Sequence, residues 1–152
     1  MTSTSPIVTT SNRPSNARHS PTLSDISIVN FPPTDPTIAF IRTSGQVGSP
    51  APDSNDPFPD ALREQAINAF ANIGACLAVG GATPRDVTKM TIYIVDIDMA
   101  TMRNDLLEVI TTFFKDSDGV VHKPASTLLG VSGLADRKFL IEVEVEAVVS
   151  LV

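Results

Sequence analysis

The segment FLIEVEVEAVV, at residues 139–149, constrains the fold more than any other part of the chain. Its apolar and acidic side chains alternate with a period of two, which places them on opposite sides of an extended backbone. The apolar side consists of Ile141, Val143, Val145 and Ala147, and the acidic side consists of Glu142, Glu144 and Glu146. This pattern predicts a strand in a sheet that has one face against the core and the other face uncovered.

Five further strands are predicted from β-branched and aromatic content and from the turn residues that flank it. They are expected within 6–14, on both sides of the PPTDP turn in 25–43, at 87–95 and at 125–132. The strand at 125–132 is expected to form a hairpin with 139–149 through residues 134–136. A loop rich in Gly, Pro, Ser and Asp is expected at 44–57.

Two helices are predicted from apolar residues that recur at intervals of three and four. The first runs over 61–79 through Leu62, Ala66, Phe70, Ile73 and Leu77, and the second runs from Met99 to Phe113 through Met102, Leu106 and Val109 or Ile110. Asp56 or Asp60 is expected to cap the first helix, and Gly80-Gly81 is expected to end it.

The resulting order, β-β-β-α-β-α-β-β, predicts a single α+β domain over residues 1–152, with two helices on one face of a mixed sheet. The other face of the sheet is left open, and away from the glutamates it carries apolar residues. Because a monomer would expose these residues to water, the pattern predicts an oligomer.

Charge and cysteine content limit the classes of partner and compartment. With a formal net charge of −6 and no run of Lys and Arg, the chain lacks the basic surface that a phosphate backbone requires, so nucleic-acid binding is not expected. No apolar run is long enough to span a membrane. Cys76 is the single cysteine; it excludes an intramolecular disulfide, and its helical spacing from Ile73 and Leu77 predicts a core position.

The compartment predicted from these features is the cytoplasm, with one alternative. A chain without disulfides fits a reducing compartment. Residues 1–24, however, contain no Asp or Glu and are rich in Ser and Thr, so a mitochondrial transit peptide stays open.

Four segments of the chain carry a resemblance to a known family. They are TSGQVG at 43–48, NIGACLAVGGATPRDVTKMTIYIVDI at 72–97, PAST at 124–127 and EVEA at 144–147. Together with the order of elements, these segments resemble the Rid (YjgF-like, L-PSP endoribonuclease) family from about Ile7 to Val149. The resemblance implies a chorismate-mutase-like fold, a homotrimer and clefts at the subunit interfaces. It also implies hydrolysis of reactive imines and enamines without a metal or an organic cofactor.

The resemblance assigns a catalytic role to Glu144, which matches the glutamate that positions or activates the hydrolytic water in the family. It assigns Ser44 and Gly45 to the cleft wall, where a glycine lets backbone approach a ligand closely. The alternative for Glu144 is that it belongs, with Glu142 and Glu146, to a simple polar strand face.

The chain departs from the family pattern in the segment PAST. The deaminating members have an arginine where this chain has Ser126, and that arginine clamps the substrate carboxylate. Ser126, Thr127 and Leu128 therefore imply a pocket with less charge. Arg103 either restores the missing charge from another direction or lies on a helix surface without a role in the pocket.

Two further departures concern aromatic and imidazole groups. The family tyrosine expected near ARHSPTLSDI, at 17–26, is missing. His19 either substitutes for that tyrosine in part or lies in an exposed loop, and His122 lies either at the cleft rim or in the loop from helix to strand.

These observations lead to three functional hypotheses. The first is a cofactor-independent, deaminase-like hydrolase of a non-standard imine or enamine. The second is a non-catalytic trimeric protein that binds or protects a metabolite. The third, ribonuclease action, is disfavoured by the acidic balance and by the lack of a histidine pair or basic groove.

Overall fold

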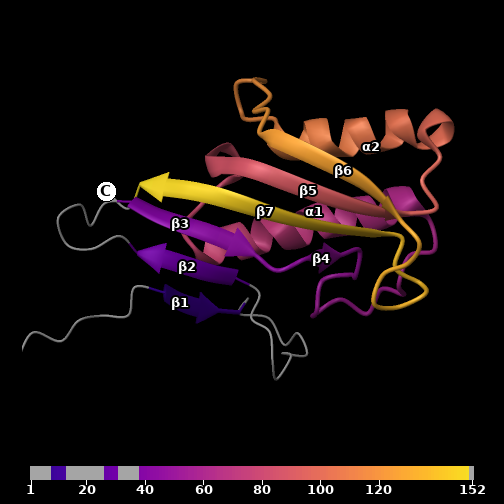
Figure 1. Ribbon diagram of the computed structural model, residues 1–152, viewed down its shortest axis with the longest axis horizontal. Helices are drawn as coiled ribbons and strands as arrows, with labels where there is room; N and C mark the ends of the chain where they lie inside the picture. Colours follow the sequence, from indigo (N-terminus) through magenta and orange to yellow (C-terminus); the bar gives the residue numbers. More distant parts are fainter. Residues whose placement is uncertain (1–7, 13–25, 31–37, 151–152) are drawn as a thin grey trace, which may run out of the picture.

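A computed structural model describes residues 8–12, 26–30 and 38–150 of the 152-residue chain. Its strands are β1 (Val8–Ser11), β2 (Ile26–Asn30), β3 (Ile38–Thr43), β4 (Gln46–Val47), β5 (Val87–Val95), β6 (Ala125–Val131) and β7 (Ile141–Ser150). Its helices are α1 (Leu62–Val79), the 3₁₀ turn η1 (Pro84–Asp86) and α2 (Met99–Phe114). The predicted α+β class, with two helices and one mixed sheet, is confirmed (Figure 1).

The strands form one sheet in the order β1-β2-β3-β7-β5-β6, and β4 pairs with β7 beyond the end of β3. All pairs are antiparallel except β5 with β6, which are parallel. The predicted hairpin between 125–132 and 139–149 is wrong, because β5 lies between β6 and β7 (Figure 1). Parallel strands need a long crossover, and α2 supplies it between β5 and β6.

The central strand, β7, has the burial pattern that its sequence predicts. Its apolar side chains are buried, from Ile141 at 0% exposure to Val149 at 6%, and its glutamates are half-buried on the opposite side. The apolar side packs with α1, α2 and β5 in one core, whose largest members include Phe70, Phe114 and Ile92. The sheet therefore has a covered face and a face that no element within the described residues covers.

The predicted end of α1 is confirmed, whereas its predicted cap is wrong. Gly80 and Gly81 donate their N–H groups to the carbonyls of Leu77 and Ala78, and Gly81 has φ +74°, a conformation that favours glycine. At the other end the cap position is Ala61, without a side-chain hydrogen bond; Asp60 does not cap the helix and Asp56 bonds to Ser54 instead. The side chain of Gln65 holds this turn, because its amide nitrogen donates to the carbonyl of Pro59.

Cys76 lies in the core, and His122 lies in a loop. Cys76 is fully buried, as its helical spacing predicted. His122 lies in the loop between α2 and β6, where its Nε2 is 2.7 Å from the carbonyl of Val87 and its ring stands edge-on to Phe114. His19 lies outside the described residues. Within the described part of the chain, neither helix is both long and apolar enough to cross a membrane.

Candidate functional site

The uncovered face of the sheet gathers the polar residues of three strands. In the register of β5 and β7, Glu142 lies opposite Tyr93, Glu144 opposite Thr91, and Glu146 beside Lys89. Laterally paired residues point to the same side of a sheet. The acidic side of β7 therefore faces away from the core together with the polar side of β5.

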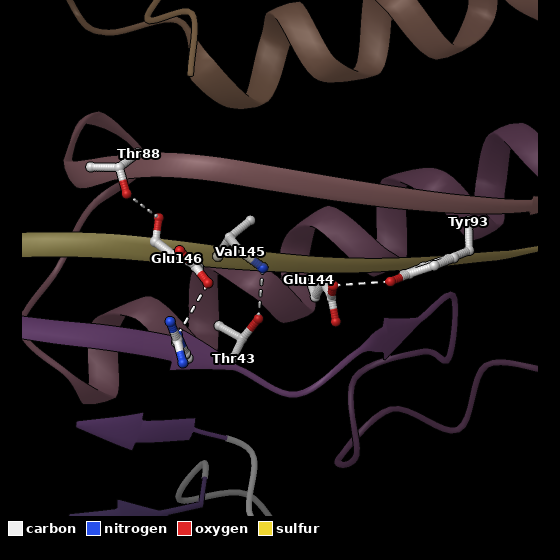
Figure 2. A network of polar contacts seen from close by, with 7 residues as sticks. Thr43, Thr88, Tyr93, Glu144, Val145 and Glu146 are labelled. Atoms are coloured by element: carbon white, nitrogen blue, oxygen red, sulfur yellow. Dashed lines mark hydrogen bonds and ion pairs between the residues drawn. The ribbon is translucent and has the colours of Figure 1, made fainter. Parts of the chain in front are cut away.

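A cavity of about 230 Å³ opens on this face between the neighbouring strands β3, β7 and β5. It is lined by Arg42, Thr43, Lys89, Thr91, Glu144, Val145 and Glu146. The floor is fixed by a buried hydrogen bond from the N–H of Val145 to the hydroxyl of Thr43, at 3.0 Å (Figure 2). Cations and carboxylates thus share one small cavity.

Glu144 is held within this cavity by a neighbouring phenol. The hydroxyl of Tyr93 donates to Oε1 of Glu144 at 3.0 Å, so the two side chains lie end to end along the sheet (Figure 2). The hydrogen bond to Glu144, then burial, then the charges of Glu144 and Glu142 raise the pKa of Tyr93. Tyr93 consequently remains a hydrogen-bond donor at all physiological pH values and orients one oxygen of the carboxylate.

Two cations lie on either side of the glutamates. Arg42 of β3 forms an ion pair with Glu146, with Nε 3.1 Å from Oε1, and Lys89 of β5 donates to the hydroxyl of Thr127. Figure 2 shows Glu146 and Glu144 projecting from β7 between strands β3 and β5. The cavity therefore holds two cations close to Glu144, of which Arg42 is paired with Glu146, and such cations can bind an anionic group of a ligand.

Glu142 lies at the other end of the acidic row, against the turn before β4. A Cβ atom added at Gly45 would lie 1.8 Å from Oε1 of Glu142, so only glycine lets the turn approach the carboxyl this closely. Burial, followed by the charge of Glu144, raises the pKa of Glu142 above its ordinary value.

The structure brings some of the predicted site residues together. Thr127 pairs with Thr91, which pairs with Glu144, so these three residues form one row across β6, β5 and β7. Gly45 contacts Glu142 as described, and Ser44 precedes it, half-buried.

Other predicted residues lie elsewhere within this chain. Ser126 and Leu128 pair with Met90 and Ile92, which are buried on the helix-covered side of the sheet. Leu128 packs against the core, whereas Ser126 is exposed at the edge strand. Arg103 lies in α2, but its side chain is outside the described part of the structure, so its predicted role in the pocket stays a prediction.

Several members of the site were not predicted from the sequence as site residues, among them Arg42, Lys89, Thr91, Tyr93 and Glu142. Polar residues alternate with buried ones in VTKMTIYIV, which is a signal that Lys89, Thr91 and Tyr93 share a face. The register between β5 and β7 is what joins that face to Glu144, and no local pattern encodes it.

The side chains that most often bind metal ions are dispersed over the described part of the chain. Among the described residues, no three His, Cys, Asp or Glu side chains come together as ligands for a metal ion.

The chain is similar to a set of known proteins. The family model described as Endoribonuclease L-PSP matches residues 35–149. A RutC family protein of Aquifex aeolicus (strain VF5) is 35% identical over 109 residues, which cover 72% of this chain and 78% of that protein. The crystal structure of yeast Mmf1 has a TM-score of 0.72 at 24% identity, and the match covers 93% of this chain and 98% of that chain. This similarity supports the assignment of the fold. The crystal structure of E. coli TdcF with bound serine has a TM-score of 0.59 at 26% identity, and the match covers 74% of this chain and 80% of that chain.

Proposed function

The chain belongs to the endoribonuclease L-PSP family, the Rid (YjgF-like) family that its motifs resemble, and on that premise we propose that it hydrolyses a small reactive imine or enamine to a carbonyl compound and ammonia. The observation that carries this proposal is Glu144, which Tyr93 holds at the wall of a small cavity beside two cations. A cavity of about 230 Å³ suits a metabolite rather than a nucleic acid, and the net charge of −6 disfavours binding of RNA.

In this mechanism Glu144 activates water. One carboxylate oxygen accepts the hydrogen bond from Tyr93, and the other is available to a water molecule. As the water oxygen bonds to the imine carbon, a water proton passes to Glu144. Transfer of a proton to the nitrogen and cleavage of the C–N bond then release ammonia and leave the carbonyl product.

The cations of the cavity are proposed to bind an anionic group of the substrate. Because Ser126 stands where the family has an arginine, the sequence predicted a pocket that does not bind a substrate carboxylate. Lys89 of β5 and Arg42 of β3 nevertheless bring positive charge to the cavity. The relative TdcF is described with bound serine, a ligand that carries both a carboxylate and a nitrogen. An analogous ligand here would place its anionic group at Lys89 and Arg42 and its imine carbon beside the water held by Glu144.

Replacement of these cations is expected to weaken substrate binding. Lys89→Met and Arg42→Gln should each raise KM for a 2-imino acid about tenfold, because a charge-assisted hydrogen bond contributes roughly 1.5–3 kcal/mol, and kcat should change less. Steady-state ammonia release measures both constants. Lys115→Met and Arg63→Gln are matched controls from the helical layer, where Arg63 forms an exposed ion pair with Glu108. An unchanged KM in both site variants would contradict this placement of the anionic group.

We also propose that the uncovered face assembles three chains around the site. An apolar row crosses four strands of this face, because Val8 pairs with Val29, Val29 with Phe40 and Phe40 with Val148. Val8 is 54% exposed and Val148 is 40% exposed. A second copy that covered this row would remove apolar surface from water and would enclose the adjacent cavity.

Sedimentation equilibrium tests this assembly. The wild-type protein is expected at three times the chain mass, and Val148→Lys is expected to shift it to the monomer, because a buried, unpaired ammonium opposes association. Ile67→Lys is the control, since Ile67 is 44% exposed on α1, in the helical layer. A wild-type monomer at micromolar concentration would contradict the proposal.

A further inference from the structure

We propose that Glu142 is a second acid–base residue of this site: it donates a proton to the substrate nitrogen, while Glu144 is the base for water. This inference rests on the proposed function and adds to it a residue that the family resemblance did not assign. It is carried by the shared side of β7, by the contact with Gly45 and by the position of Tyr93 between the two carboxyls.

The spacing of the two glutamates along β7 allows both to act on one small molecule. Glu142 and Glu144 are two residues apart on the same side of a strand, so their backbone origins lie roughly 7 Å apart at 3.2–3.4 Å per residue. Tyr93 spans this interval, because it lies opposite Glu142 in register and bonds to Glu144.

The surroundings of Glu142 favour its protonated form relative to an exposed glutamate. On β5, the neutral phenol of Tyr93 lies opposite Glu142, and on β7 the nearest charged group is the carboxylate of Glu144. Residues 44–47, in the turn and β4, carry no charge. The turn covers the carboxyl at Gly45. Burial and the charge of Glu144 both raise the pKa of Glu142, which extends the pH range in which it holds a proton.

The reaction balances with these two groups alone. Glu142 donates its proton to the imine nitrogen, and water then adds to the carbon while Glu144 takes one proton from it. Glu144 passes that proton to the nitrogen. The C–N bond breaks with its electron pair on the departing ammonia, and the hydroxyl proton of the adduct returns to Glu142, so both carboxyls regain their starting states.

The pH profile of ammonia release from a freshly generated 2-imino acid tests the proposal. In the wild-type protein kcat is expected to fall as the pH rises through the raised pKa of Glu142. Glu142→Gln is expected to lower kcat about 10²-fold, at the low end of the 10²- to 10⁴-fold contribution of general acid–base catalysis, and to remove this falling limb. Glu142→Asp should restore part of the rate, and Glu108→Gln, a neutralised glutamate of the helical layer, should leave both the rate and the profile unchanged.

Stability against pH provides a readout that does not depend on the substrate. Because the pKa of Glu142 is higher in the folded than in the unfolded chain, the folded chain binds more protons between the two values. The free energy of unfolding of the wild type should therefore decline as the pH rises through this window. Glu142→Gln should lack the decline, and Glu144→Gln should reduce it.

The outcomes separate the two proposals. Ammonia release by the wild type with an unchanged rate and pH profile in Glu142→Gln would overturn the role of Glu142 and leave the proposed function standing. A wild type without imine hydrolysis would overturn the proposed function and the acid role together. Identical pH dependence of stability in wild type and Glu142→Gln would overturn the protonated state on which the acid role depends.

Discussion

Glu144→Gln is expected to lower kcat for ammonia release from a 2-imino acid by about 10²- to 10⁴-fold, the usual contribution of a general base. Glutamine has the same length and can accept the hydrogen bond of Tyr93 through its amide oxygen, so the geometry of Figure 2 is preserved. What it loses is the capacity to take a proton from water. The effect should therefore lie in kcat, with the fold, the assembly and substrate binding largely retained.

Glu108→Gln is the matched control for this substitution, since it neutralises a glutamate that pairs with Arg63 on the opposite side of the molecule. Circular dichroism and sedimentation would verify that both variants fold and assemble as the wild type does. A Glu144→Gln protein that hydrolyses imines at the wild-type rate would contradict the base mechanism, whatever the substrate.

Gln65→Leu is expected to destabilise the fold by about 4 kcal/mol, because it leaves three backbone groups without a partner at roughly 1–3 kcal/mol each, offset in part by the added apolar side chain. Gln65 is fully buried on α1. Its amide nitrogen donates to the carbonyls of Pro59 and Lys138, and its amide oxygen accepts the N–H of Leu140, all at 2.8 Å. Urea unfolding measures the loss.

Gln46→Leu is the control for this prediction. Gln46 is also buried, but its amide makes a single hydrogen bond to the carbonyl of Ser44, so its replacement should cost about 1 kcal/mol. Equal losses in the two variants would show that the bonds of Gln65 do not act as described. A large loss is relevant to function because Gln65 ties α1 to the residues that lead into β7, the strand that carries Glu142 and Glu144.

The elements with strong periodicity were predictable from the sequence. The alternation gave the correct face for residues 141–147 of β7, and the intervals of three and four in 61–79 gave α1 to within one residue at its start. The order of strands was not predictable in the same way. The short connection between β6 and β7 is typical of a hairpin. In the structure β6 instead pairs in parallel with β5, and the crossover through α2 makes this pairing possible. The sequence alone does not show which partner β6 takes. β4 has two residues and leaves no periodic signal.

The candidate site was predictable only in part, for a related reason. Glu144 and Thr127 were found by resemblance, and they lie in one row of the sheet. Tyr93 and Lys89 lie in the neighbouring rows, opposite Glu142 and Glu146, and their side chains reach Glu144 and Thr127. These positions follow from the register between strands, which depends on long-range pairing rather than on local sequence. Adjacent residues of a strand point to opposite sides, so Ser126 and Thr127 do not share a face within one chain.

The measurement that tests the central claim most directly is ammonia release from freshly generated 2-imino acids by the native protein, compared with Ser126→Arg and with buffer alone. The account predicts that the native protein accelerates release, since Lys89 and Arg42 supply the charge that Ser126 does not. Acceleration by Ser126→Arg alone would contradict the anion-binding role of Lys89 and Arg42 and would favour a substrate without a carboxylate. Acceleration by neither protein, together with binding of a metabolite that is not converted, would contradict the hydrolase and favour a binding protein.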